Sequence, residues 1–189
     1  MTMGEANVDI RRSRAFRMPR DAKATVIPAG TPTVLAEGEE VTLLQALGTT
    51  ATVTTGDGEM VRLTAADSVE FGFIDAAAVR EVADGEFSID AVWAAAATVY
   101  DPEIPVDIVE LGLVYKVDAS ELPSGNTRVE IDMSVTAPFC GMGDIMRQDL
   151  HEAVAVLPGV EEVEVTLVFD PPWDVSRLSD VARLELGMM

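Results

Sequence analysis

The 189-residue sequence has one cysteine and one histidine, and this scarcity limits the chemistry that the chain can carry out by itself. A single cysteine cannot form an internal disulfide, so the sequence predicts a protein of a reducing compartment. A cluster held by one chain normally takes about four thiolate or imidazole ligands, and Cys140 and His151 supply only two. The sequence therefore excludes a disulfide framework and a cluster held by cysteines and histidines of one chain.

Basic residues are also scarce. The chain has 13 Lys and Arg against 33 Asp and Glu, a formal net charge of −20. Nucleic acids and anionic membrane surfaces attract Lys and Arg patches, so this charge argues against both partners. No apolar run reaches the ~18 residues of a membrane span and no signal-peptide pattern is present, which predicts a cytoplasmic protein. A hydrophobic content of 48% is enough for a buried core.

Composition divides the chain into four segments. Residues 1–23 hold six of the 13 basic residues and form a basic N-terminal arm, which we expect to fold back on the acidic body, to be disordered or to contact an acidic partner. Residues 24–69 show short β-prone runs with turns such as Gly56-Asp57-Gly58, typical of a small all-β module, either an antiparallel sheet or a barrel. Residues 70–87 are the predicted linker, and residues 88–189 mix helical and strand patterns.

The last segment predicts an α+β domain, in which helices pack on a small three-stranded or larger mixed sheet. The predicted elements are a helix capped by Ser88, strands at 113–117, 128–135 and 163–169, a helix at 142–157 and a last helix from Asp174 to about Gly187. The third strand follows a helix, which favours parallel pairing with a neighbour. Trp93 and Tyr100 lie on the apolar stripe of the first helix and are expected in the core.

Cys140 lies between a predicted strand and a predicted helix. Pro138 should end the strand, and Gly141 and Gly143 allow a tight turn into the helix, so Cys140 is expected beside the helix N-terminus. Such a position can lower the pKa of a thiol and make it reactive. A small buried side chain is the alternative, and the residues leave both open. His151 lies eleven residues later, about 16 Å along a helix, too far to share a metal with Cys140.

Several blocks resemble a known family. They are 101–115 (DPEIPVDIVELGLVY), 136–143 (TAPFCGMG), 157–160 (LPGV), 170–173 (DPPW) and 182–187 (ARLELG). In this order they resemble the signature of iron–sulfur (metal–sulfur) cluster assembly proteins across about residues 88–189. The preceding β-prone module, with its IPAGTP and QALG runs, points to the SufT branch of this family.

The resemblance implies a maturation role that helps iron–sulfur clusters reach client proteins. Its functional cysteine corresponds to Cys140, the implied metal ligand, with Asp101, Glu103 and Thr136 in signature positions as supporting residues. The implied cofactor is a transient cluster or iron shared with a partner, and the implied partners are assembly proteins, client apo-proteins and, as an option, a second copy of the chain. Asp107 departs from the pattern, where Asn is expected, and adds a negative charge.

Two further functions from other classes stay open beside this non-enzymatic one. The first is a thiol-dependent enzyme or redox sensor with Cys140 as nucleophile. A second cysteine to resolve a sulfenate is missing, and no histidine is placed as a base, which argues against it. The second is a scaffold in which Cys140 is structural.

Overall fold

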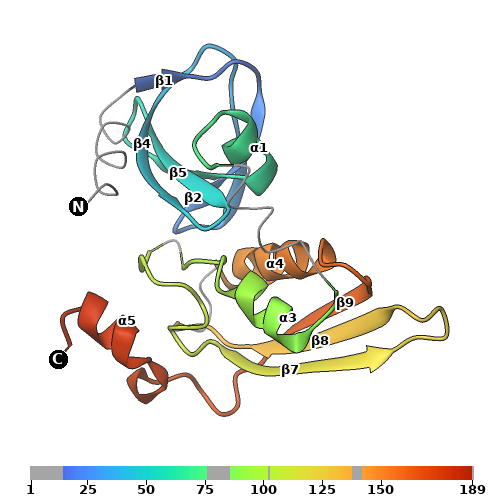
Figure 1. Cartoon of the computed structure of the whole chain (residues 1–189). Coiled ribbons are helices and arrows are strands. Elements are labelled where there is room, and N and C mark those ends of the chain that lie inside the picture. The colour runs from blue at the N-terminus through green and yellow to red at the C-terminus, as the bar shows by residue number, and fades with distance from the viewer. Residues whose placement is uncertain (1–14, 76–85, 102, 138–141, 189) are drawn as a thin grey trace, which may run out of the picture. The chain divides into compact units, whose positions relative to one another are not determined.

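The computed structural model describes residues 15–75, 86–101, 103–137 and 142–188 of the chain (Figure 1). The chain divides into two compact units, residues 1–75 and 76–189. Each unit has its own cluster of buried hydrophobic side chains. Within the described ranges, no helix has both the length and the apolar character needed to cross a bilayer.

The C-terminal unit is a mixed α+β structure. Its elements are α3 (Ile89–Ala96), β7 (Val114–Glu121), β8 (Thr127–Met133), α4 (Met142–Ala155), β9 (Val160–Leu167), the 3-10 helix η1 (Val175–Arg177) and α5 (Asp180–Glu185). The strands form a sheet in the order β7-β8-β9, in which β7 pairs antiparallel and β9 parallel to β8 (Figure 1). The parallel pair confirms the expectation drawn from the helix that precedes the third strand.

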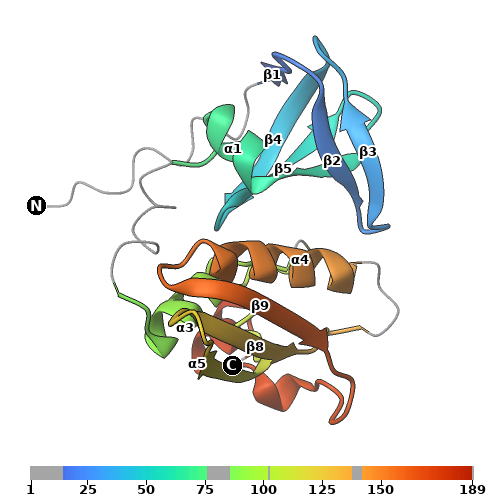
Figure 2. The same cartoon turned by 90° about the vertical axis from the view of Figure 1, so that its right-hand side faces the viewer.

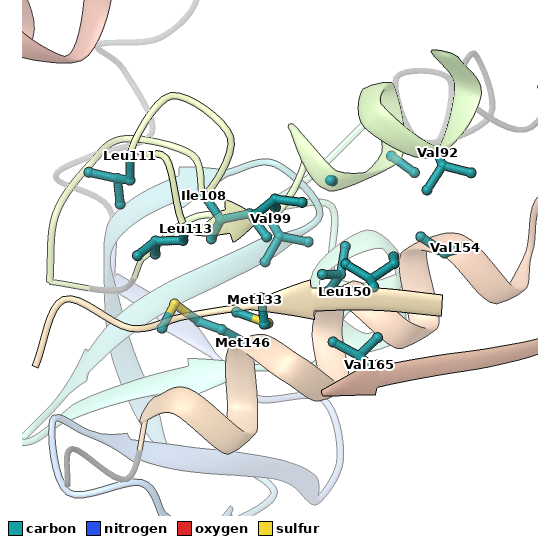
Figure 3. Packing of buried hydrophobic residues seen from close by; sticks show 14 of the residues in the cluster. Val92, Val99, Ile108, Leu111, Leu113, Met133, Met146, Leu150, Val154 and Val165 are labelled. Carbon is teal, nitrogen blue, oxygen red and sulfur yellow. The ribbon is translucent and has the colours of Figure 1, made fainter. Parts of the chain in front are cut away.

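The core of this unit lies between the sheet and its helices. On β8, Val129, Ile131 and Met133 are buried, whereas the residues between them face solvent, as the period-2 pattern predicts. Buried side chains of α4 recur every four residues, which places them on one helical face. They are Met142, Met146, Leu150 and Val154. Figure 3 shows Met146, Leu150 and Val154 beside Met133 and Val165 of the sheet.

Helix boundaries differ from the predicted ones in two places. The helix capped by Ser88 ends at Ala96, before Tyr100, which instead forms an isolated bridge with Asp107. The predicted last helix is broken: Asp174 caps only the 3-10 turn, and Ser179 caps α5 separately by accepting a hydrogen bond from Ala182 N at 3.0 Å. Leu178 between them has extended ψ, so helical backbone bonds cannot continue through it.

The N-terminal unit is a six-stranded antiparallel sheet in the order β1-β4-β5-β6-β2-β3, with one helix. Its elements are β1 (Ala15–Arg17), β2 (Ala22–Ile27), β3 (Thr31–Leu35), β4 (Glu40–Leu47), β5 (Thr50–Thr55), β6 (Met60–Leu63) and α1 (Ala65–Glu70). The predicted Gly56-Asp57-Gly58 turn joins β5 to β6, and Thr55 N donates to Glu59 O across it at 3.0 Å. Of the two predicted alternatives, an antiparallel sheet or a barrel, the structure has the antiparallel sheet.

This unit is larger than the predicted all-β module. Residues 15–23 were expected in the basic arm, but β1 pairs with β4 and β2 begins at Ala22, so these residues belong to the sheet. The unit also contains α1, whose N-cap Thr64 accepts a hydrogen bond from Asp67 N at 3.2 Å. Phe71 and Phe73, expected in the linker, pack against the core of this unit. The remainder of the predicted arm lies outside the described residues.

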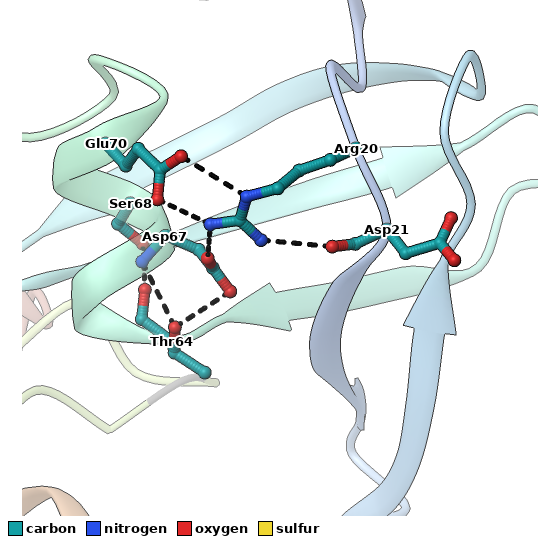
Figure 4. A network of polar contacts seen from close by, with 6 residues as sticks. All are labelled: Arg20, Asp21, Thr64, Asp67, Ser68 and Glu70. Carbon is teal, nitrogen blue, oxygen red and sulfur yellow. Dashed lines mark hydrogen bonds and ion pairs between the residues drawn. The ribbon is translucent and has the colours of Figure 1, made fainter.

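Arg20, a basic residue of the predicted arm, binds acidic side chains of α1. Its guanidinium donates to Asp67 Oδ1 at 2.7 Å and to Glu70 Oε2 at 2.5 Å (Figure 4). Its Cζ lies 5.0 Å from the ring centre of Phe71. The carboxylates of Glu70 and Asp67 raise the pKa of Arg20. Arg17 likewise pairs with Glu40 at 3.0 Å. These two arginines are therefore bound to acidic residues of their own unit.

Candidate functional site

The turn that begins at Asp101 is held by a buried carboxylate. The Asp101 residue is 5% exposed, and its Oδ1 accepts hydrogen bonds from Glu103 N at 2.8 Å and Ile104 N at 3.1 Å. A buried carboxylate is stable only when such donors replace its water. Asp101 therefore shapes the turn, while the Glu103 side chain is exposed. The structure brings these two predicted site residues together through the Glu103 amide and not through their two carboxylates.

Asp107 holds a second turn in the same way. Its Oδ1 accepts from Val109 N at 2.9 Å and from Glu110 N at 3.0 Å. Burial raises the pKa of Asp107, although these two backbone hydrogen bonds partly oppose the shift, and the nearby Glu110 charge adds to it. An asparagine, the residue expected here, could accept the same two hydrogen bonds through its amide oxygen. The aspartate accepts them and also places a carboxylate in a half-buried position.

A segment near the C-terminus is docked on these turns. Trp173 Nε1 donates to the carbonyl oxygen of Leu111 at 2.7 Å, although the two residues are 62 positions apart. Tyr115 donates its hydroxyl hydrogen to Pro171 O at 3.1 Å. The Arg177 guanidinium lies 3.8 Å from the ring centre of Tyr115, within the range of a cation–π contact. Two blocks that are distant in the sequence therefore form one structure.

Glu110 and Gly112 complete this docking. Ser179 N donates to Glu110 O at 3.0 Å, and the Ser179 hydroxyl donates to the Glu110 carboxylate. Gly112 has φ +66°, and a Cβ built on it would lie 2.3 Å from the carbonyl oxygen of Arg177. Only glycine fits this close approach of two backbones. The sequence alone did not predict these contacts. The signals that it contains are Gly112 and the two family-like blocks at 101–115 and 170–173.

The segment that carries Cys140 begins after β8. Ser134 N donates to Leu113 O at 2.8 Å, which ties the end of β8 to the start of β7. Thr136 is half-buried and follows two residues later. Residues 138–141, and with them Cys140 and the strand end predicted at Pro138, lie outside the described residues. The predicted place of Cys140 at a helix N-terminus is therefore retained as a proposal.

The far end of this segment is fixed at Gly143. A Cβ on Gly143 would lie 2.9 Å from Val135 Cγ1 and 3.6 Å from Leu167 Cδ1. The absence of a side chain lets the first turn of α4 approach the end of β8 and β9. The two stretches that flank residues 138–141 are thus packed against each other at Val135 and Gly143.

The described residues hold no group of three or more His, Cys, Asp or Glu side chains able to bind a metal ion. His151 is on the exposed side of α4, as expected. Asp144, a potential oxygen ligand in the first turn of α4, lies 3.3 Å from Arg147 Nε.

Residues 89–166 match the family described as "Iron-sulfur cluster assembly protein". A "Fe-S protein maturation auxiliary factor" of Porphyromonas gingivalis is 40% identical over 92 residues, which are 49% of this chain and 84% of that protein. The "Fe-S protein maturation auxiliary factor SufT" of Staphylococcus aureus is 36% identical over 90 residues, 48% of this chain and 98% of that protein.

Among solved structures, a "Domain of Unknown Function DUF59" from Bacillus anthracis is 36% identical, with a TM-score of 0.46. The match covers 53% of this chain and 92% of that chain. The 90 matched residues make up 98% of the S. aureus protein. That protein is therefore too short to contain counterparts of both units of this chain. The similarity to SufT is confirmed, and the β-prone module is not what carries it.

Proposed function

The chain belongs to the family of iron–sulfur cluster assembly proteins, and on this premise we propose that it is a maturation factor that helps clusters reach client apo-proteins. In this proposal the cluster, or iron, is cargo, and the chain is a binding protein without catalytic activity of its own. Cys140 is the thiol that ligates iron during transfer. The cytoplasm, as a reducing compartment, keeps this thiol free.

The observation that carries the proposal is the packing of Gly143 against Val135. It joins the two sides of the segment that contains the chain's one cysteine, within the region matched to the family. A thiol that must exchange iron with another protein needs a defined place and access to the partner. The packed flanks of the segment support the first of these requirements.

Asp101 and Thr136 have supporting roles in this proposal. Asp101 holds its own turn through the amides of Glu103 and Ile104, so its contribution is to shape the protein around the site. Thr136 lies at the start of the cysteine segment, and its proposed role is to support the thiol there.

The ligand count then defines the partners. One thiolate per chain leaves an iron of a common cluster without its other protein ligands. Assembly proteins and client apo-proteins are the proposed source of the remaining thiolates. A homodimer would supply a second Cys140 and would still need ligands from elsewhere.

The test is transfer of a [4Fe–4S] cluster, under anaerobic conditions, to an apo-enzyme that becomes active on receiving it. The full chain should increase the transfer rate, and Cys140→Ser should abolish the increase because a hydroxyl is a poor ligand for cluster iron. Adding Ser120→Cys to the Cys140→Ser protein places a thiol on the exposed part of β7 and should not restore transfer.

Circular dichroism of both variants must match the parent protein, so that loss of folding is separated from loss of the thiol. Transfer by folded Cys140→Ser at the parent rate would contradict the proposal. It would favour the scaffold function, in which Cys140 is structural. Restoration by Ser120→Cys would show that any exposed thiol suffices.

A further inference from the structure

The two sheets of the described chain have four edge strands, and three of them carry features that block a further strand. In the N-terminal unit, β1 has only three residues and β3 contains Pro32, which has no N–H to donate. In the C-terminal unit, β7 has a register shift between Val114 and Lys116. β7 also carries Lys116, and an edge lysine discourages strand addition.

The fourth edge, β9, carries no lysine or proline. Its own register shift lies at its start, between Val160 and Glu162, and the strand is regular from Glu162 to Leu167. It has eight residues, contains no proline, lysine or glycine, and pairs with β8 in parallel from Thr127↔Val160 to Met133↔Leu167. On its other side no strand of the described residues pairs with it, and Figure 2 shows it along one border of the sheet. Alternate backbone N–H and C=O groups of such an edge strand point away from the sheet and can bind a further strand.

Charge on β9 decides which strand would fit. Glu162 and Glu164 project from the solvent face of the sheet and share the guanidinium of Arg128, at 3.2 and 2.5 Å. Glu130 of β8 also contacts Arg128, at 3.1 Å, so three carboxylates share one cation. The excess negative charge along this edge attracts lysine and arginine and repels acidic segments.

The same face has room for a long basic side chain. A shallow hollow of about 200 Å³ lies over the sheet, bordered by Glu164 and Thr166 of β9 and by Glu130 and Asp132 of β8. A lysine or arginine on a strand added beside β9 can extend over β9 toward these carboxylates. The hollow also contains Lys116, which is already paired with Asp118.

A second copy of the chain fits this edge poorly. Antiparallel pairing of two β9 strands about Val163 places Glu162 of each strand opposite Glu164 of the other. Like charges directly opposite each other destabilise a strand pair. The occupant must therefore differ from β9 in charge.

We propose that the outer edge of β9 binds an extended segment of another protein that has lysine or arginine at alternate positions. Backbone hydrogen bonds to β9 hold the segment, and the carboxylates of Glu162 and Glu164 select its basic side chains. The proposal uses no contact of Cys140, so Cys140→Ser should bind the segment as the parent chain does.

Two eight-residue peptides test the proposal by NMR with the full-length, isotope-labelled chain. In one, lysine alternates with valine; in the other, glutamate alternates with valine. The lysine peptide should bind, slow hydrogen exchange of amides in β9, and bind more weakly at higher salt. The glutamate peptide should not bind. Equal binding of both peptides, binding of neither, or changes centred on β7 or α5 would overturn the proposal.

Charge reversal separates a local effect from the net charge of −20. Glu162→Lys with Glu164→Lys should weaken the lysine peptide about tenfold or more and allow the glutamate peptide to bind. The control, Glu121→Lys with Glu152→Lys, makes the same change in net charge at exposed positions of β7 and α4. Equal weakening by both pairs would show that bulk charge alone attracts the peptide, which contradicts a site on β9.

Discussion

The carbonyl oxygen of Arg177 lies 2.3 Å from where a Cβ on Gly112 would begin. This approach joins the turn after Asp107 to η1, which is brought there by the hydrogen bond from Trp173 to Leu111. The family-like blocks at 101–115 and 170–173 are thus packed against each other.

The contact at Gly112 predicts a large loss of stability for Gly112→Ala. The alanine must adopt φ +66° and its Cβ must displace the backbone of Arg177. Backbone strain and overpacking together should cost about 3 kcal/mol or more. Urea unfolding followed by tryptophan fluorescence measures this, because both tryptophans, Trp93 and Trp173, are in the C-terminal unit.

Gly125→Ala is the matched control for this prediction. Gly125 also has a positive φ, +84°, but a Cβ there has no neighbour within 4 Å. It should therefore carry only the backbone strain, about 1–2 kcal/mol. Equal losses at the two positions would show that the close approach of Arg177 does not matter.

Gly143→Ala should depend on Val135. Alanine is favoured over glycine within a helix by up to about 1 kcal/mol, but its Cβ would lie 2.9 Å from Val135 Cγ1. Because a valine side chain has little freedom to move, we expect Gly143→Ala to destabilise the protein by about 1 kcal/mol. In a Val135→Ala background the same change should instead stabilise it. A double-mutant cycle without coupling would rule out this contact.

Asp107→Asn should stabilise the folded chain at neutral pH. The amide oxygen of asparagine can still accept from Val109 N and Glu110 N, while the charge is no longer half-buried. Since burial raises the pKa of Asp107 above its ordinary 3.8, the folded state binds the proton more tightly than the unfolded state. The parent protein therefore loses stability as pH rises through the folded-state pKa.

The gain from Asp107→Asn should consequently grow with pH from about 3 to 7 and be smallest at the acidic end. Asp107→Ala is the control, because it removes both the charge and the acceptor for two amides. It should destabilise the protein by about 1–2 kcal/mol. A gain from Asn that is constant across the pH range would exclude charge burial as the cause.

The two units should separate on limited proteolysis. Phe71 and Phe73 pack in the core of one unit and Phe87 against the core of the other. We therefore predict that a protease cuts first between residues 73 and 87, within the expected linker, and leaves two resistant fragments that mass spectrometry can identify. First cleavage inside either sheet would contradict independent folding of the units.

Local patterns predicted much of this fold. The alternation of Val129 and Ile131 on β8 and the cap at Ser88 are visible in short windows, because each is formed by neighbours in the sequence. The contact between Arg177 and Gly112 joins residues that are far apart in the sequence, so a pattern within a short stretch of sequence cannot predict it. β1 was missed for the same reason, since three residues are a strand only through pairing with β4.

The signal for α1 was present but too short to use. Thr64 and Asp67 have the spacing of a helix N-cap, yet six residues show too little of a 3.6-residue period. At the candidate site, the sequence indicated Asp101 as a functional residue but not what it does. Its hydrogen bonds to Glu103 and Ile104 show that a signature residue can act by shaping a turn.

The purified chain should not retain an iron–sulfur cluster by itself. Cys140 is its one thiol, and His151 is on the exposed side of α4. Carboxylates are poor substitutes for thiolates around cluster iron, so a cluster on the isolated chain would lack ligands and lose iron rapidly. After anaerobic reconstitution, we expect visible absorbance to disappear within minutes of adding a chelator and to persist longer with glutathione or a client that donates thiolates. Chelator-resistant iron and sulfide bound one-to-one to a monomer on native mass spectrometry would contradict this, and Asp101, Glu103 and Asp144 would then be the ligands to substitute first.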